Sequence, residues 1–341
     1  MVDWANRHPL SMFVMTCLIV LVAGNAWIGS WSSRLPYRRK LAEIARAGNP
    51  NLLFVGNSLL DGHTDEADLE LAAYQRGMIL RSLNAALGAT QPPEQELLFK
   101  DAIQSHPSLR MLVIGAYDLQ LTSEPQTRVD DLVGNRMVGI DSRFSMQEVR
   151  NAYSFDQGQQ LAVELLRTFP LAANRGSAWR DVEVLRRRMG QIGMPHLATN
   201  SMGRVSDFDA LEGGSVEEFD AQIERFLRSN RRFNSSYRAI LQEAHDRDMG
   251  VVILIMPMSP YHRQTYYSRS SWRTYLEALR QMAAREHVSV IDASGWIPDQ
   301  DGFVDHLHLA PGAVGPFSTM LGNALAALPN LRSTPVDFSH P

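Results

Sequence analysis

The chain is expected to fold as an α/β protein with three layers, in which helices cover both faces of a five-stranded parallel sheet. Short apolar runs, partly β-branched and bounded by turn residues, recur along the sequence and suit strands buried on both faces. Segments with helical spacing separate these runs, and such alternation is typical of parallel sheets. With 341 residues, 45% hydrophobic and 21% charged, the chain has an ordinary globular composition.

Five apolar runs are the expected strands: Leu52–Gly56, Met78–Asn84, Met111–Gly115, Val251–Met256 and Val288–Asp292. Apolar residues at helical spacing predict the helices between and around them. These are Arg38–Ala47, Pro92–His106, Ser215–Asp248, Trp272–His287 and Gly315–Leu328.

Residues 1–33 are expected to form an N-terminal transmembrane helix. The segment from Pro9 to Ser33 carries no charged side chain and is largely apolar, and about 20 such residues suffice to span a bilayer. Trp27 and Trp31 lie at one end, where indole rings favour the membrane interface. The alternatives are a buried helix and a signal peptide cleaved near the small residues Gly24–Ala26.

The rest of the chain is divided by its composition. Residues 34–50 are interpreted as a basic linker, 51–330 as the main domain and 331–341 as a tail. Within the main domain, residues 119–214 do not follow the strand–helix alternation. The region is long for a connection between two strands, so we expect it to fold on its own or to cover another surface.

Charge and cysteine content argue against several classes of protein. The net charge of −4 gives no electrostatic reason to expect binding to nucleic acid. Cys17 is the only cysteine, which excludes an intrachain disulfide, a cysteine zinc site and a CxxC redox motif. The sequence also has no His, Asp and Glu cluster with the spacing of metal ligands. We therefore expect neither a metal nor a cofactor.

Three polar residues far apart in sequence are expected to meet at one edge of the sheet. Ser58 directly follows the first strand, and Asp305 and His308 follow the last one. The carboxyl ends of parallel strands share an edge, which is where ligands bind in open α/β sheets. A hydroxyl becomes a nucleophile when an imidazole takes its proton and a carboxylate orients that imidazole. This set predicts acyl transfer through a serine ester.

Three segments resemble the conserved blocks of SGNH, or GDSL-like, hydrolases. They are Gly56-Asn57-Ser58-Leu59-Leu60-Asp61-Gly62, Leu83-Asn84-Ala85-Ala86-Leu87-Gly88-Ala89-Thr90 and Asp305-His306-Leu307-His308-Leu309. The resemblance implies the flavodoxin-like fold of that family, with Ser58 as nucleophile, His308 as base and Asp305 as its partner. It also implies an oxyanion hole that includes the N–H groups of Ser58 and Gly88.

The third block departs from the family pattern Gly-x-Asn-Asp. This chain has Gly115-Ala116-Tyr117-Asp118, so Tyr117 stands where the family has an oxyanion-hole asparagine. A phenol can donate a hydrogen bond, although with a different reach. The expected hole is therefore Ser58 and Gly88, with Tyr117 as a further candidate.

Other residues near the expected edge are candidates for substrate contact. Asn57 precedes the serine, and His306 lies between Asp305 and His308, where it competes with His308 for the role of base. Met258 and Ser259 follow the fourth strand, where a simple chain reversal explains them equally well. His63 follows Ser58 closely and is interpreted as a surface or substrate-facing residue.

The sequence favours an enzyme that forms an acyl-Ser58 intermediate and transfers an acyl group, most simply acetyl, to an envelope or extracellular polysaccharide. The resemblance to envelope-modifying SGNH-like proteins implies a single-pass anchor, an extracytoplasmic domain and a multi-span membrane acyltransferase as partner. The basic residues Arg34 to Lys40 favour the opposite orientation, but large domains translocate largely regardless of charge. The alternatives are an esterase and a catalytically inactive binding subunit of a polymer-modifying complex.

Overall fold

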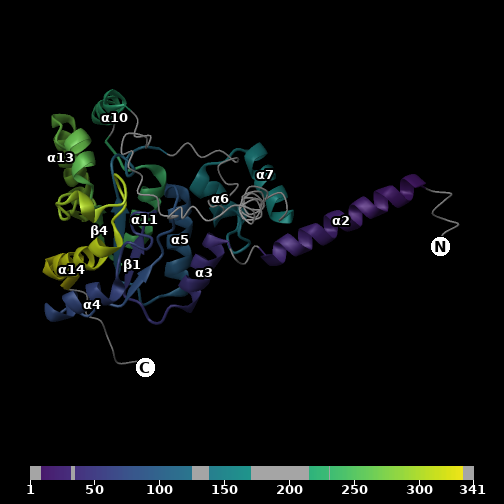
Figure 1. The fold of residues 1–341 in the computed structure, drawn as a ribbon, viewed down its shortest axis with the longest axis horizontal. Coiled ribbons are helices and arrows are strands. Elements are labelled where there is room, and N and C mark those ends of the chain that lie inside the picture. Colours follow the sequence, from purple (N-terminus) through teal and green to yellow (C-terminus); the bar gives the residue numbers. More distant parts are fainter. Residues whose placement is uncertain (1–8, 32–34, 125–137, 170–214, 230, 333–341) are drawn as a thin grey trace, which may run out of the picture. The chain divides into compact units, whose positions relative to one another are not determined.

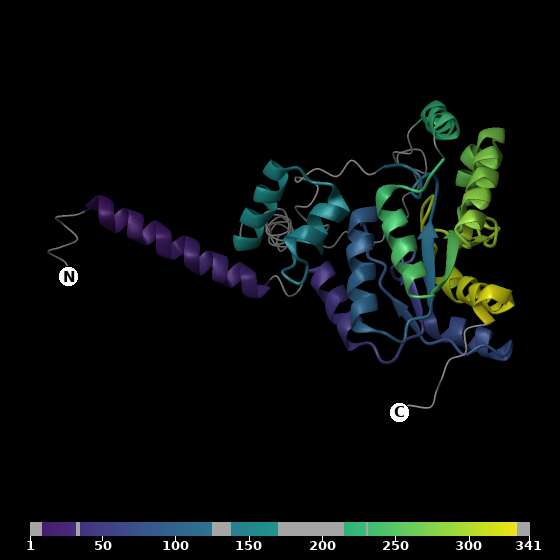
Figure 2. The ribbon, with the colours of Figure 1, turned by 180° about the vertical axis from the view of Figure 1, so that it is seen from behind.

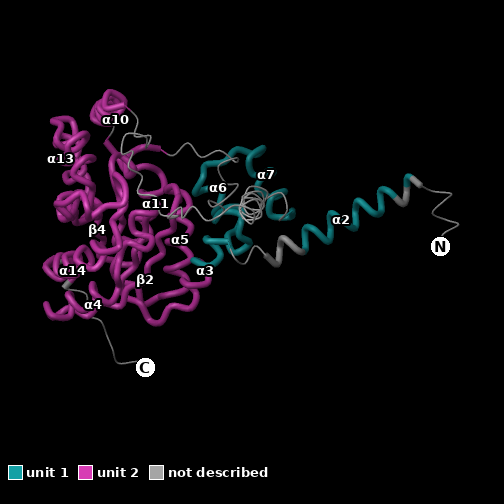
Figure 3. The backbone as a smooth tube through the Cα atoms, in the orientation of Figure 1, with its two compact units in different colours: residues 1–40, 127–197 teal, residues 41–126, 198–341 magenta. Residues whose placement is uncertain are grey.

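The computed structural model describes residues 9–31, 35–124, 138–169, 215–229 and 231–332. The chain divides into two compact units, coloured separately in Figure 3. The first comprises Met1–Lys40 and Thr127–Leu197, and the second comprises Leu41–Gln126 and Ala198–Pro341. The second unit contains the whole sheet.

The sheet has five parallel strands, as predicted, and they lie in the order β2-β1-β3-β4-β5 (Figure 1). Figures 1 and 2 show α5 and α11 on one face and α13 and α14 on the other. The expected three-layer α/β/α arrangement is therefore confirmed for this unit. The strands are β1 (Leu52–Val55), β2 (Ser82–Asn84), β3 (Met111–Ala116), β4 (Gly250–Ile255) and β5 (Ser289–Asp292).

The second strand is shorter than the sequence predicts. Pairing begins at Ser82, whereas the apolar run begins at Met78. The Asn51 side chain explains the difference, because it donates to the carbonyl oxygen of Ile79 at 2.9 Å and accepts from the N–H of Arg81 at 2.8 Å. A side chain therefore satisfies backbone groups that a neighbouring strand would otherwise pair.

The segment predicted as one helix, Ser215–Asp248, forms two. They are α10 (Val216–Arg228) and α11 (Ser235–Asp246). The Asn234 side chain accepts from the N–H of Tyr237 at 3.1 Å and so caps the start of α11. A capping asparagine has non-helical backbone angles, which ends any continuous helix at that point.

The remaining elements of the second unit surround the sheet, and α4 was not predicted. They are α4 (Glu66–Gln75), α5 (Pro92–Ser105), α12 (Pro260–His262), the π-helix η4 (Arg263–Tyr267), α13 (Ser270–Arg285), η5 (Gln300–Gly302), α14 (Pro311–Ala327) and α15 (Pro329–Arg332). Helix α3 (Pro36–Arg46) includes residues of both units.

The first unit contains α2 (Pro9–Trp31), η3 (Val138–Ile140), α6 (Met146–Tyr153) and α7 (Gln157–Thr168). In the ranges that the structure describes, none of the helices has the length and apolar character needed to cross a membrane. The transmembrane helix expected within residues 1–33 is therefore not confirmed. Residues 125–137 and 170–214, which make up more than half of the irregular region predicted at 119–214, lie outside the described residues.

Helices α4 and α14 pack closely against each other. A Cβ atom added at Gly322 would lie 2.3 Å from the carbonyl oxygen of Leu69 and 3.0 Å from Cβ of Ala72. The N–H of Asp65 at the start of α4 donates to Oγ of Ser318 on α14 at 2.7 Å. Because α4 follows the turn that carries Ser58 and α14 follows the loop that carries His308, this packing fixes the two segments relative to each other.

We expect Gly322→Ala to lower the free energy of unfolding by about 1–3 kcal/mol, because its methyl group would meet backbone atoms that cannot move aside. Gly312→Ala is the matched control in the same helix. No atom lies within 4 Å of its added Cβ, and alanine stabilises a helix relative to glycine by up to about 1 kcal/mol. Urea unfolding of both variants measures the difference. Equal stabilities would contradict the close approach of α4 and α14.

Candidate active site

The three predicted residues form one hydrogen-bonded chain. Nε2 of His308 lies 2.9 Å from Oγ of Ser58, although the two residues are 250 positions apart. Nδ1 of His308 lies 2.7 Å from Oδ2 of Asp305. A carboxylate only accepts, so Nδ1 carries the proton and Nε2 of the neutral ring accepts from the serine hydroxyl. This is the tautomer in which an imidazole can take a proton from Ser58.

Ser58 stands in a tight turn that its neighbours hold in place. Oδ1 of Asn57 accepts from the N–H of Leu59 at 3.0 Å, and the carbonyl oxygen of Asn57 accepts from Leu60 and Asp61 at 3.1 and 3.0 Å. The side chain of Leu60 is fully buried below the turn. Asn57, expected to contact substrate, has its side-chain oxygen committed to the turn, and its substrate role stays a prediction.

The loop with Asp305 and His308 is shaped by the same carboxylate. Oδ1 of Asp305 accepts from the N–H groups of Leu307 and His308, both at 2.8 Å, while Oδ2 holds the imidazole. Burial by itself raises the pKa of Asp305, but the hydrogen bonds from the side chain and backbone of His308 and from Leu307 outweigh it and lower the pKa to about 2. Asp305 is therefore ionised at neutral pH and fixes the ring of His308.

Asp61 occupies part of the expected oxyanion hole. Gly88 lies beside the nucleophile, since a Cβ added there would be 3.8 Å from Cβ of Ser58. Its N–H, however, donates to Oδ2 of Asp61 at 2.8 Å. A negative charge at this place opposes the negative charge that develops on a carbonyl oxygen during acyl transfer. The sequence predicts no such role for Asp61, because only the folded turn brings it to Gly88.

Tyr117 directly follows β3. Burial, and after it the neighbouring Tyr117 hydroxyl, raise the pKa of Tyr237. The part of Tyr117 in an oxyanion hole stays a prediction. Asn84, at the end of β2, supports the other side of the site. Its amide donates to the carbonyl oxygen of Leu60 at 3.0 Å and to Thr64 at 2.9 Å.

The loop after β4 lies against the His308 loop. Ser259 donates its N–H to the carbonyl oxygen of His306 at 3.2 Å, and the ring of His306 packs edge-on against Tyr261 at 4.6 Å. Met258 and Ser259 are fully buried, and His306 is nearly so. These contacts support a structural role, and substrate contact by the three residues stays a prediction.

Two histidines near the site have partners that the sequence did not reveal. Nε2 of the buried His262 lies 2.9 Å from Oδ1 of Asp118, which accepts a hydrogen bond from it. The backbone N–H of Asp118 donates to the hydroxyl of Tyr267 at 3.0 Å. His63 lies beside His308, with ring centres 5.5 Å apart. Their spacing in sequence carries no recognisable motif, so only the fold reveals these contacts.

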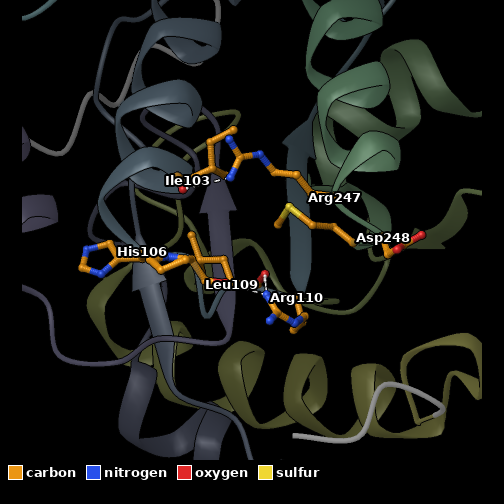
Figure 4. A pocket seen from close by; sticks show the side chains of 8 residues that line it. Ile103, His106, Leu109, Arg110, Arg247 and Asp248 are labelled. Carbon is orange, nitrogen blue, oxygen red and sulfur yellow. Dashed lines mark hydrogen bonds between the residues drawn. The ribbon is translucent and has the colours of Figure 1, made fainter. Parts of the chain in front are cut away.

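A separate pocket of about 390 Å³ lies at the opposite end of the strands (Figure 4). Arg110 and Met249, two of its lining residues, directly precede β3 and β4, whereas Ser58 follows the end of β1. The two guanidinium groups there donate to nearby oxygen atoms. That of Arg110 donates to the carbonyl oxygen atoms of Pro107 and Leu109. That of Arg247 donates to the Glu243 carboxylate and to the carbonyl oxygen of Ile103. Among the described residues, no group of three or more His, Cys, Asp or Glu side chains could hold a metal ion.

Comparison with known proteins finds similarity only at the level of solved structures. No family model and no curated protein matches the chain. A GDSL-like lipase from Bacteroides thetaiotaomicron is 8% identical, with a TM-score of 0.36, and the match covers 85% of this chain and 96% of that one. An acylhydrolase from Bacteroides fragilis is 9% identical, also with a TM-score of 0.36, covering 87% and 98%. These values are too low to carry an argument on activity, which must come from the site.

Asp61→Asn is expected to speed the reaction of Ser58 with an acyl ester or a fluorophosphonate by about tenfold or more, because it removes a negative charge beside the developing oxyanion. The asparagine oxygen can still accept from Gly88, so the turn is kept. Asp301→Asn, which removes the same charge from an exposed position in η5, is the control. Rates of probe labelling measure the effect. A slower reaction of Asp61→Asn would show that the carboxylate assists the site.

Asp305 makes the free energy of unfolding depend on pH in the acid range. Its pKa is about 2 in the folded chain against 3.8 for the free side chain. The unfolded chain therefore binds more protons in this window, so the stabilisation is complete above pH 3.8 and is lost as pH falls towards 2. Urea unfolding between about pH 5 and pH 2 should show a weaker pH dependence in Asp305→Asn than in the wild type. Identical profiles would contradict the hydrogen-bonded carboxylate.

Proposed function

We propose that the chain is a serine acyl-ester enzyme that works through an acyl-Ser58 intermediate. The observation that carries the proposal is the contact of 2.9 Å between Nε2 of His308 and Oγ of Ser58, with Asp305 on the other ring nitrogen. A nucleophile, a base within hydrogen-bond reach and a group that orients the base are the three parts that nucleophilic catalysis needs.

The chemistry follows from these contacts. Oγ of Ser58 attacks the carbonyl carbon of an ester while its proton passes to Nε2 of His308, and ionised Asp305 stabilises the resulting imidazolium. The tetrahedral intermediate collapses when His308 returns the proton to the departing alcohol, which leaves an acyl group on Ser58. A second hydroxyl compound then attacks this ester and gives its proton to His308. Ser58 leaves and recovers that proton.

The second nucleophile decides between two activities. With a sugar hydroxyl the reaction is O-acyl transfer, and with water it is ester hydrolysis. We favour transfer of an acyl group, most simply acetyl, to an envelope or extracellular polysaccharide, on the resemblance of the sequence blocks to proteins that modify such polymers. The same resemblance suggests a multi-span membrane acyltransferase as partner. Single-pass attachment and an extracytoplasmic location stay predictions of the sequence.

A second candidate function is that of a binding subunit without catalysis. It is favoured by the carboxylate of Asp61 on the N–H of Gly88 and by Tyr117 in place of an asparagine. Loss of one oxyanion donor costs about a hundredfold or more in rate. A chain with such a hole could keep the fold and use the same edge to hold polymer.

Labelling of the full chain with a fluorophosphonate probe tests the proposal that the protein is a serine enzyme. We expect labelling of the wild type, none of Ser58→Ala, and labelling of His308→Ala slower by a factor of about 10³–10⁴. Ser268→Ala removes an exposed serine hydroxyl and should leave labelling unchanged. Mass spectrometry of the intact protein after labelling places the adduct. A wild type that does not react would favour the binding subunit.

Transfer and hydrolysis are separated by the same donor ester assayed with and without an oligosaccharide acceptor. Transfer predicts that the acceptor becomes acylated and that release of free acid falls in proportion. Release of acid that no acceptor changes would leave an esterase as the function.

A further inference from the structure

A second imidazole lies beside the catalytic one. His63 is five residues after Ser58, and its Nδ1 lies 2.8 Å from the carbonyl oxygen of Ser58. The ring centres of His63 and His308 are 5.5 Å apart, with the rings inclined by 38°. His63 also donates its backbone N–H to the carbonyl oxygen of Leu60 at 3.2 Å, so the residue belongs to the serine turn. The reaction described above does not use this ring.

The contact with Ser58 fixes the tautomer of His63. A carbonyl oxygen only accepts, so Nδ1 of His63 carries the proton. Burial, with a smaller effect of the nearby His308, lowers the pKa of His63, and it outweighs the backbone hydrogen bonds to Ser58 and Asp61 and the Asp61 charge, which raise this pKa. The ring is therefore neutral at neutral pH, and the lone pair lies on Nε2. His63 offers a hydrogen-bond acceptor whose position the serine turn determines.

We propose that His63 determines the acceptor specificity of the second half-reaction by accepting a hydrogen bond from a hydroxyl next to the one that is acylated. The inference rests on the proposed acyl-Ser58 chemistry. Two imidazoles side by side can each hold one of two adjacent hydroxyls of a sugar ring. Water and a simple alcohol offer only one oxygen, so they gain nothing from the second ring.

The transfer of the acyl group from Ser58 to the acceptor needs only the groups of the acceptor, Ser58 and His308. One hydroxyl oxygen of the acceptor bonds to the acyl carbon, and its proton passes to Nε2 of His308. The neighbouring hydroxyl donates to Nε2 of His63 throughout and loses no proton. The bond between the acyl carbon and Oγ of Ser58 then breaks, and His308 returns the proton to Ser58. His63 therefore positions the acceptor without exchanging a proton.

Two substitutions separate this role from a structural one. In His63→Asn the amide nitrogen can replace Nδ1 and keep the bond to the Ser58 carbonyl oxygen, but no acceptor stands in the place of Nε2. In His63→Gln the longer side chain can present its oxygen near the place of Nε2, but it gives up the bond to Ser58. A positioning role predicts that His63→Asn is the more impaired variant in acceptor choice, and a structural role predicts the reverse.

The experiment uses the full chain, a soluble acetyl ester as donor, and either ethylene glycol or ethanol as acceptor. In the wild type we expect transfer to the diol to exceed transfer to ethanol. In His63→Asn this preference should fall by about tenfold, the effect of one hydrogen bond. His63→Gln should keep part of it. Fluorophosphonate labelling of Ser58 in His63→Asn should stay within about twofold of the wild type.

The outcomes are distinct. A diol preference that His63→Asn leaves unchanged, with normal labelling of Ser58, would overturn the role of His63 and leave the acyl-Ser58 proposal intact. Loss of labelling in both variants, or greater loss of preference in His63→Gln, would assign His63 to the support of the turn. A wild type that is never labelled or acylated would remove the proposed function, and the role of His63 with it.

Discussion

The site depends on the meeting of two chain segments that the sequence holds 250 residues apart. The first is the turn after β1, held by Asn57 and closed from below by buried Leu60. The second is the loop organised by Asp305. Parallel strands bring both segments to the same edge of the sheet. The close packing of α4 against α14 holds the two segments in fixed positions relative to each other. Gly322 makes this approach possible because only hydrogen fits between its backbone and that of Leu69.

Asp61 gives the site its unusual electrostatics. In a site that binds an oxyanion, backbone N–H groups point towards the position where negative charge will develop. Here a carboxylate already accepts from the N–H of Gly88, next to Ser58. The carboxylate of Asp61 and the hydroxyl of Ser58 are thus carried by one short turn. Any acyl chemistry requires this side chain to move aside or requires the hole to use other donors, such as the N–H of Ser58.

The same turn carries His63, so one segment holds Ser58, the Asp61 carboxylate on the N–H of Gly88 and the imidazole of His63 beside that of His308. Hydrogen bonds within residues 57–63 connect the residues of this turn to one another. In the role proposed for His63, the site distinguishes a polyhydroxy acceptor from water by a second hydrogen bond. The pocket at the opposite end of the strands has its arginine side chains bound to backbone and glutamate oxygen atoms and lies away from the triad.

The sequence by itself determined the parallel sheet and the identity of the residues that meet in the Ser58–His308–Asp305 chain. Both follow from local features: buried strands appear as apolar runs, and the positions of Ser58, Asp305 and His308 relative to strand ends are properties of the chain order. The tertiary structure decided what depends on approach between distant segments. The shortening of β2 by Asn51, the contact of Asp61 with Gly88 and the pairing of His63 with His308 each join residues that are far apart in the sequence. Periodicity reports which face of an element is buried, but it carries no information on where a polar side chain finds its partner.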